Sequence, residues 1–326
     1  MGRLASRLRQ RIYSDRLTRQ LYAIYFLPWM TFTARYPVGR QIYDHEWDAL
    51  IVLDACRVDA MREVAPEYDF IQDVERVVSV GSTSKEWISN TFTERYRDEI
   101  RDTACVSANS WVDTVLTEDV DWGFWTATKE SFLESHEMFS RLMARDTVLQ
   151  SDFETFESIG GLGANESFGV TTAEDVTDYA IHTARRSDAN RLLVHYMQPH
   201  APYLGHIDAD GNIDEVDHKP FEALRAGADG DDVWERYLDN LRYVLSNVER
   251  LLENLDANRV VITADHGEMF GELGLYEHIG GIPHPALKTV PWVETTATDT
   301  HSYEPEIETR TDETAVEDRL ADLGYL

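Results

Sequence analysis

The sequence predicts an α/β fold in which a doubly wound, mainly parallel sheet is sandwiched between helices. Short apolar runs alternate along the chain with segments of helical periodicity, which is typical of this class. The runs are continuous rather than alternating in polarity, as expected for strands buried on both faces. Polar residues follow several runs directly, at the edge of the sheet where α/β enzymes bind their ligands.

Five apolar runs are predicted as strands, and helices are predicted between and after them. The strands are 49–53, 77–80, 104–106, 191–197 and 260–263. One helix is expected to end at about 64, and a second to begin at Thr83 and continue to about 97. Two more are expected at about 173–186 and 232–255. Residues from about 111 to 170 are predicted as helices and loops around the sheet, and about 314–323 as a short final helix.

The length of 326 residues suits one large domain with small additions. We divide the chain into a basic-aromatic N-terminal arm (1–43), a catalytic domain (44–294) and an acidic C-terminal segment (295–326). The two cysteines, Cys56 and Cys105, provide neither a disulfide framework nor zinc-ligand spacing, which is typical of a reducing compartment.

The chain is strongly acidic, with 60 Asp and Glu against 30 Lys and Arg and a formal net charge of −30. Such an excess of acid predicts a protein of the halophilic type, because salt screens the self-repulsion that would otherwise destabilise the fold. An acidic surface that repels nucleic acid would have the same composition. Duplex DNA and RNA are therefore excluded as expected partners.

The N-terminal arm departs from this acidic pattern. Residues 1–40 contain eight arginines and one acid, and the apolar run 21–30 is too short to span a bilayer and is interrupted by Pro28. No secretory signal follows, so we expect a cytoplasmic protein. Two interpretations stay open: residues 1–40 rest on the inner face of an anionic membrane, or they form a packing arm that covers the sheet.

Four predicted strands end in polar groups that suit a metal or ester site. These are Asp54, the hydroxyl cluster 82–84, His200, and the pair Asp265 and His266. A carboxylate and an imidazole supply one oxygen and one nitrogen to a divalent cation, and Gly267 would let the backbone turn away. Taken alone, the pair has another explanation, in which Asp265 caps the next helix and His266 lies on the surface. Polar groups at four strand ends together favour a binding site.

Several motifs resemble the alkaline phosphatase superfamily, in its sulfatase-like branch. The matching pieces are Leu53-Asp54, the hydroxyl cluster at a helix start, 195–203 (HYMQPHAPY), 263–268 (TADHGE) followed by Gly271-Glu272, 290–293 (VPWV) and 320–325 (LADLGY). The resemblance spans roughly residues 47–326. It implies a metal-dependent hydrolase or transferase that acts on phosphate or sulfate esters, with a small molecule, glycan or lipid as substrate. The alternative is a non-catalytic relative that binds an anionic ligand or a partner.

By this resemblance, Asp54, Asp265 and His266 hold one divalent ion (Mn²⁺, Mg²⁺, Ca²⁺ or Zn²⁺) together with the oxygen of the nucleophile. His200 and His278 would contact the ester and protonate the leaving group. Further substrate contacts are expected from four residues: Asn109, His195, Lys85 and His284.

Two departures from the family pattern refine this expectation. The Cys-x-Pro-Ser-Arg motif of formylglycine sulfatases is absent, which favours a direct hydroxyl nucleophile. Asp54 is followed by Ala55 rather than by a second acid, which suggests a single-metal site similar to that of phosphoglycerol and phosphoethanolamine transferases.

Three hydroxyls compete for the role of nucleophile. Alignment with the family's threonine pattern selects Thr83, which also forms a capping box with Glu86 at the predicted helix start. A shift of the alignment by one residue selects Ser84, and Ser82 is the remaining candidate.

Overall fold

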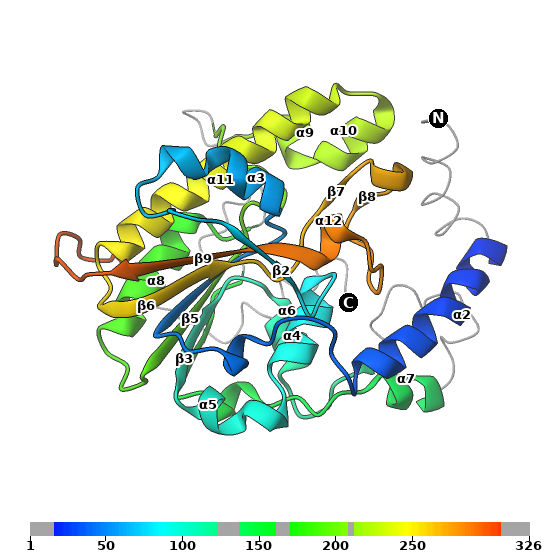
Figure 1. Cartoon of the computed structure of the whole chain (residues 1–326), viewed down its shortest axis with the longest axis horizontal. Coiled ribbons are helices and arrows are strands. Elements are labelled where there is room, and N and C mark those ends of the chain that lie inside the picture. Colours follow the sequence, from blue (N-terminus) through cyan, green and yellow to red (C-terminus); the bar gives the residue numbers. More distant parts are fainter. Residues whose placement is uncertain (1–15, 123–136, 161–169, 208–211, 308–326) are drawn as a thin grey trace.

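The computed structural model describes residues 16–122, 137–160, 170–207 and 212–307. Within these ranges a seven-stranded sheet runs in the order β2-β9-β6-β1-β5-β3-β4 (Figure 1). Its strands are β1 (Ala49–Leu53), β2 (Glu75–Val78), β3 (Thr103–Ser107), β4 (Thr155–Ser158), β5 (Arg191–Tyr196), β6 (Ala257–Thr263) and β9 (Thr289–Ala297). A separate hairpin pairs β7 (Met269–Phe270) with β8 (Tyr276–Glu277).

The centre of the sheet is parallel, which confirms the predicted fold class. Strand β1 pairs in parallel with β5 on one side and β6 on the other, and β3 pairs in parallel with β5 and β4. Every residue of β1 and β3 is buried, as their continuous apolar sequences require. Among these seven strands only β9 runs opposite to the rest, and it pairs antiparallel with β6 on one side and with the edge strand β2 on the other.

Two strands of the seven-stranded sheet were missed in the sequence, as were the two short strands of the β7–β8 hairpin. Strand β4 lies in the stretch predicted as helices and loops. It was missed because it is a half-buried strand at the edge of the sheet, and its sequence, Thr-Phe-Glu-Ser, lacks an apolar run. Strand β9 contains Pro291, a residue that argues against a strand in the interior of a sheet. Here the side-chain hydroxyl of Thr263 on β6 donates to the Pro291 carbonyl at 2.7 Å.

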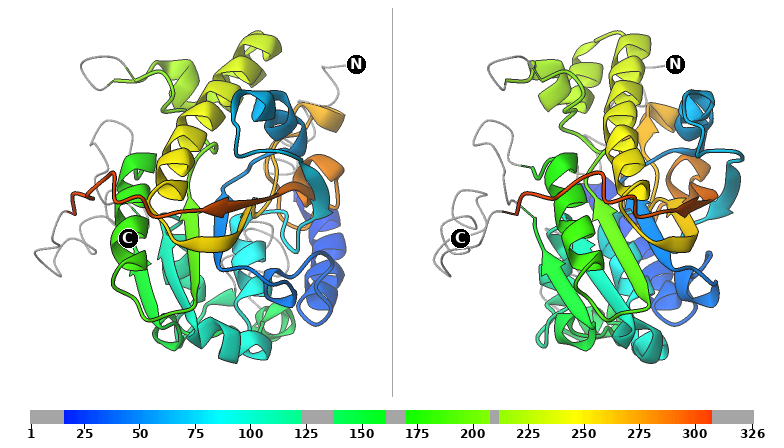
Figure 2. Two further views of the ribbon diagram at one scale, coloured as in Figure 1. Left: turned by 60° about the vertical axis from the view of Figure 1, so that its left-hand side comes forward. Right: turned by 90° about the vertical axis from the view of Figure 1, so that its left-hand side faces the viewer.

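The helices form layers on the two faces of the sheet (Figure 2). Helices α3, α8 and α11 pack together on one face, whereas α4, α5 and α6 lie on the other. The α-helices are α2 (Arg16–Thr33), α3 (Val58–Val64), α4 (Ser84–Thr91), α5 (Arg97–Arg101), α6 (Trp111–Val115), α7 (Glu137–Met143), α8 (Ala173–Ala184), α9 (Glu215–His218), α10 (Pro220–Ala226), α11 (Gly230–Leu252) and α12 (Pro285–Lys288). Single 3₁₀ turns cover Ile42–Asp44, Ala65–Glu67, Glu94–Tyr96, Gln150–Asp152 and Glu272–Gly274.

The predicted helices agree with α3, α8 and α11 to within a few residues. The helix that begins after Thr83 is shorter than expected, because α4 ends at Thr91 and the chain continues through a 3₁₀ turn into α5. The predicted final helix and the 320–325 motif lie outside the described residues. Within the described ranges no helix combines the length and apolar character that crossing a bilayer requires.

Two apolar clusters hold the fold together. The larger one surrounds the sheet. The smaller one lies between α2, α7 and the loops that follow β6, and its members are Tyr22, Phe26, Met30, Met143, Met269, Leu275, Ile279 and Leu287. The arm therefore packs its α2 helix against loops beside the carboxyl edge of the sheet, rather than over the sheet itself.

Candidate metal and ester site

The carboxyl ends of two neighbouring parallel strands bring three candidate metal ligands together. Asp54 follows β1, whereas Asp265 and His266 follow β6, and these strands are hydrogen-bonded neighbours. One ligand atom from each of the three side chains lies within 4.8 Å of the others, and all three residues are buried. Asp54 and Asp265 lie 211 positions apart in the chain, yet with His266 they form one compact donor set of two carboxylates and one imidazole.

Unpartnered atoms in this donor set fit a cation. Among the described residues, no hydrogen bond reaches Asp54 Oδ1 or Asp265 Oδ2. Each of these oxygens lies 3.5 Å from His266 Nε2. The His266 ring donates from Nδ1 to the Gly267 carbonyl at 2.8 Å, so the lone pair of Nε2 faces the two carboxylates. Two carboxylate oxygens and one imidazole nitrogen suit Zn²⁺ or Mn²⁺, and additional oxygen ligands would suit Mg²⁺ or Ca²⁺.

The electrostatics of the site also call for positive charge. Burial, followed by the nearby Asp265 and Glu268, raises the pKa of the Asp54 carboxyl well above its ordinary value. Burial lowers the pKa of His266, and it lowers the pKa of His195 to about 4, so both imidazoles are neutral at pH 7. Three buried acids thus meet imidazoles in their metal-binding form, and a bound cation would offset the repulsion among the carboxylates.

The three candidate nucleophiles have different surroundings. Ser84 Oγ lies 3.2 Å from Asp54 Oδ2 and 3.2 Å from His266 Nε2, beside the donor set. Thr83 is the N-cap of α4, where its side chain accepts a hydrogen bond from Glu86 N at 3.3 Å. Ser82 Oγ donates to Glu86 Oε2 at 2.7 Å and accepts from Gly281 N at 2.9 Å. Of these hydroxyls, Ser84 contacts the donor set directly.

The predicted substrate contacts divide into two that adjoin the donor set and two that do not. Asn109 donates from Nδ2 to Asp54 Oδ2 at 2.7 Å, and His195 Nε2 lies 3.7 Å from Asp265 Oδ2 behind the ligands. The ammonium of Lys85 instead lies 3.5 Å from the centre of the Trp111 ring. His284 caps α12, where its Nδ1 accepts from Ala286 N at 3.1 Å.

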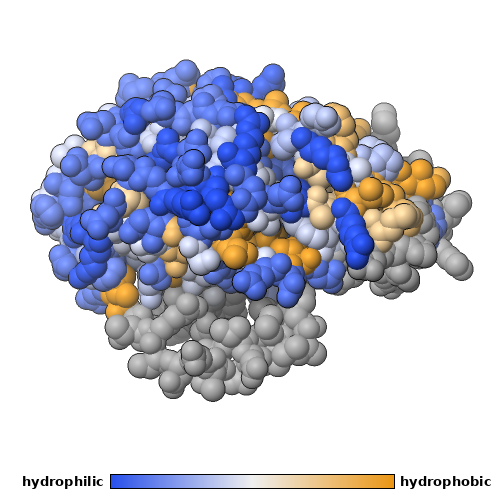
Figure 3. Space-filling view, turned by 90° about the horizontal axis from the view of Figure 1, so that it is seen from below, coloured by the Kyte–Doolittle hydropathy of each residue, from blue (hydrophilic) through white to orange (hydrophobic). Residues whose placement is uncertain are grey.

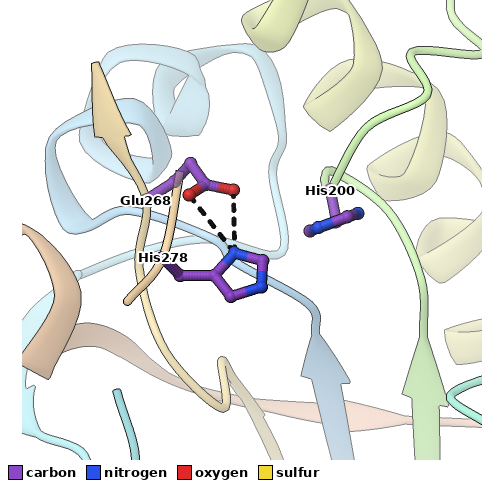
Figure 4. Close-up of side chains that lie close together, drawn as sticks. All are labelled: His200, Glu268 and His278. Atoms are coloured by element: carbon purple, nitrogen blue, oxygen red, sulfur yellow. Dashed lines mark hydrogen bonds and ion pairs between the residues drawn. The ribbon is translucent and has the colours of Figure 1, made fainter. Parts of the chain in front are cut away.

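A second group of metal-ligand type adjoins the first. His200 follows β5 and faces Glu268 and His278, as Figure 4 shows. Ligand atoms of these three residues lie within 4.8 Å of one another, and His278 Nδ1 is 3.3 Å from each carboxylate oxygen of Glu268. The centre of the His278 ring is 4.5 Å from that of His266. Burial, and then the nearby His278, lowers the pKa of His200 to about 4.

Glu268 was not selected in the sequence, although it belongs to the Asp-His-Gly-Glu motif. Its position two residues after His266 and ten before His278 gave no sign that its side chain would meet His278, because that contact depends on how the intervening β7–β8 hairpin folds back.

The turn after His266 has a different basis from the one expected. Among the described residues no helix begins there, and Asp265 Oδ1 accepts from the backbone amides of Ala55 at 3.2 Å and His266 at 2.8 Å. Gly267 donates to the Leu287 carbonyl at 2.8 Å, and a Cβ at this position would lie 2.1 Å from the Ala286 carbonyl oxygen. Glycine is therefore needed for close backbone approach, and not for a left-handed turn.

Comparison with known proteins gives structural similarity only. No family model matches the sequence, and no curated protein matches it either. The chain is similar to the integral membrane protein lipooligosaccharide phosphoethanolamine transferase A from Neisseria meningitidis, with 14% identity, 78% of this chain and 48% of that chain covered, and a TM-score of 0.47. It thus spans about half the length of that protein.

Two structures of single domains show similar sequence identities and TM-scores to this chain. The soluble domain of the Neisseria meningitidis transferase is 15% identical, with 78% of this chain and 77% of that chain covered and a TM-score of 0.46. The C-terminal periplasmic domain of EptC from Escherichia coli, in complex with zinc, is 14% identical, with 83% and 79% covered and a TM-score of 0.44.

Proposed function

We propose that this chain is a metal-dependent hydrolase or transferase of the alkaline phosphatase superfamily that acts on phosphate or sulfate esters, with Ser84 as its nucleophile. One observation carries the proposal: Ser84 Oγ lies 3.2 Å from both Asp54 Oδ2 and His266 Nε2, beside carboxylate oxygens that have no hydrogen-bond partner among the described residues. Metal coordination is one of the ways in which a serine hydroxyl is activated for nucleophilic ester cleavage, and a serine beside a metal-ligand set is placed for it.

The ligand residues and the nucleophile have separate tasks in this proposal. Asp54, Asp265 and His266 would hold one divalent cation, which, when bound, lowers the pKa of a coordinated hydroxyl and offsets charge on the ester oxygens. Ser84 lies in the first turn of α4, where backbone N–H groups and the helix dipole favour the anionic oxygens of a phosphate or sulfate. Asn109 holds the Asp54 carboxylate in place through its 2.7 Å hydrogen bond.

The reaction proceeds as a displacement. Ser84 Oγ loses its hydroxyl proton to solvent and forms a bond to the phosphorus or sulfur atom, the bond to the leaving oxygen breaks, and that oxygen takes up a proton. His278 suits the role of proton donor, because its Nδ1 lies 3.3 Å from each oxygen of the Glu268 carboxylate, which orients the ring. His200, whose pKa is about 4, is neutral at pH 7 and would contact the ester oxygens rather than donate a proton to them. Water or an acceptor hydroxyl would then release the ester from Ser84.

The second group of ligand type supports one alternative for these histidines. His200, Glu268 and His278 could hold a second cation, since their ligand atoms lie within 4.8 Å of one another. Two metal equivalents per chain, with the second lost in a His278→Ala variant, would assign the group to a cation. One equivalent would leave the group to proton transfer. The single-metal expectation from the sequence thus stays a prediction.

The experiment combines metal analysis with turnover. Protein purified in high salt should contain at least one divalent ion per chain and cleave an aryl phosphate monoester, an aryl phosphodiester or an aryl sulfate. Asp265→Asn should lose both metal and turnover, whereas Lys85→Ala, which changes a residue away from the donor set, should keep the metal. Stoichiometric metal without turnover of any of these esters would favour the non-catalytic relative, and a chain that binds no metal would refute the proposal.

The three-part division of the chain and its cytoplasmic location also stay predictions. Cell fractionation, followed by detection of the protein in each fraction, would test the location.

A further inference from the structure

Helix α2 carries a second apolar stripe on its exposed side. The exposed residues Leu21, Ile24, Tyr25, Pro28 and Phe32 follow one another at helical spacing. Leu21 and Ile24 each keep 59% of their surface exposed, and Phe32 keeps 49%. A helix that is apolar on both sides but packed on only one leaves an apolar surface exposed to water, which is unfavourable.

The opposite side of α2 is firmly packed. Tyr22, Phe26 and Met30 belong to the smaller apolar cluster, where they meet Met143 of α7 and Ile279 of the loop after β8. The helix is therefore held in position, and its exposed stripe is not free to turn inward.

Helix α7 and the end of α2 extend the exposed stripe into a wider surface. Met138 and Leu142 of α7 are 61% and 37% exposed, and Tyr36 is 67% exposed. Arg35 Nη1 donates to the Leu142 carbonyl at 2.7 Å, which joins the two elements. Apolar residues gather at this end of the molecule in Figure 3. We call this surface the α2 face and define it by Leu21, Ile24, Phe32, Tyr36, Met138 and Leu142.

The charge around the α2 face indicates what would cover it. No acidic residue occurs between Arg16 and Tyr43, whereas the whole chain has a net charge of −30. The same range contains four arginines: Arg16, Arg19, Arg35 and Arg40. A second copy of this chain would bring another strongly acidic molecule against the first. An anionic lipid bilayer instead offers an apolar interior for the stripe and negative headgroups for the arginines.

The α2 face also adjoins the candidate site. The Tyr22 hydroxyl donates to the Gly280 carbonyl, and that of Tyr25 donates to the Gly281 carbonyl at 2.6 Å. The same loop follows His278, and Gly281 N donates to Ser82 Oγ at 2.9 Å, two residues before Ser84. Helix α2 therefore supports the loop that connects the proposed proton donor with the nucleophile segment.

From this arrangement we infer that the α2 face docks on an anionic lipid bilayer and that the ester cleaved at Ser84 belongs to a molecule held in that bilayer. The inference rests on the proposed ester chemistry and adds to it the class of substrate. The docked helix brings the site to the membrane surface, where a lipid-borne phosphate or sulfate ester is confined to the same layer as the catalytic residues.

The test uses the full chain and vesicles of phosphatidylglycerol and phosphatidylcholine. The wild-type protein should co-sediment with vesicles that contain the anionic lipid and much less with pure phosphatidylcholine. A variant with Leu21→Glu, Ile24→Glu and Phe32→Glu should bind at least about tenfold more weakly, since it loses apolar burial and adds negative charge. A matched control, Ile207→Glu, changes an exposed apolar residue outside the α2 face and should bind as wild type does.

Turnover separates the parts of the inference. The triple variant should cleave a soluble aryl ester at the wild-type rate, with an unchanged circular dichroism spectrum, but should lose at least about tenfold in rate on a phosphoester lipid in the same vesicles. Vesicle binding that the triple variant retains would overturn the docking. A concentration-dependent dimer that the triple variant abolishes would assign the face to a second copy and overturn it too. Absence of soluble turnover in the wild type, with vesicle binding intact, would refute the ester chemistry and with it the lipid substrate, but not the docking.

Discussion

Alanine substitutions at Ser84 and Thr83 separate the nucleophile from the helix cap. Thr83→Ala removes one cap hydrogen bond, to Glu86 N at 3.3 Å, and should lower the free energy of unfolding by about 1 kcal/mol. Turnover should change little, because Ser84 keeps its contacts with Asp54 and His266. Ser84→Ala removes the attacking oxygen and should reduce kcat by at least about a thousandfold.

Three measurements on each variant distinguish loss of the nucleophile from loss of metal or of stability. These are kcat on the aryl ester that the wild type cleaves best, bound metal per chain, and the urea midpoint of unfolding. Ser84→Ala should retain metal, since Asp54, Asp265 and His266 remain, whereas Asp265→Asn serves as the control that loses it. Near-normal turnover in Ser84→Ala, with loss of turnover in Thr83→Ala, would refute the geometric reasoning and return the assignment to the threonine that the sequence alignment selects.

Two further predictions concern stability. Removal of the metal with a chelator should lower the free energy of unfolding, by about 2.7 kcal/mol when the free metal concentration had been 100 times its Kd. In the metal-free state Asp54→Asn should be more stable than wild type, because the substitution removes one of the buried carboxylates that repel one another. Calorimetry showing that metal-free Asp54→Asn is no more stable than metal-free wild type would contradict the electrostatic argument. Gly267→Ala should lower the free energy of unfolding by roughly 1–3 kcal/mol and weaken metal uptake, since its Cβ would lie 2.1 Å from the Ala286 carbonyl oxygen. An unchanged urea midpoint in Gly267→Ala would refute this expectation.

The sequence alone determined the class of fold and the edge of the sheet at which the polar residues lie. Continuous apolar runs at 49–53 and 260–263 identify strands that are buried on both faces, and such strands pair in parallel with helices outside. Parallel strands present their carboxyl ends at one edge, so the polar residues directly after them share that edge. Local pattern and backbone geometry therefore place Asp54, Asp265 and His266 at one edge of the sheet, whereas the pairing of β1 with β6 brings the three side chains together.

Two strands of the sheet, β4 and β9, were beyond this reasoning. Strand β4 is half-buried and lacks an apolar run, and β9 contains Pro291. Their place in the sheet comes from pairing with β3, β6 and β2, which are partners distant in the chain. Non-local pairing of this kind leaves no periodic signal in the strand's own sequence.

Only the tertiary structure decided which side chains within each motif face the site. Neighbouring hydroxyls at 82–84 are equivalent in sequence, yet α4 begins so that Thr83 caps the helix and Ser84 meets Asp54. The contact of Glu268 with His278 depends on the β7–β8 hairpin, and the exposed stripe of α2 depends on which side packs against the loop after His278. Spacing along the chain fixes a residue's place on a strand or helix, whereas its direction toward a distant partner is set by how the elements pack.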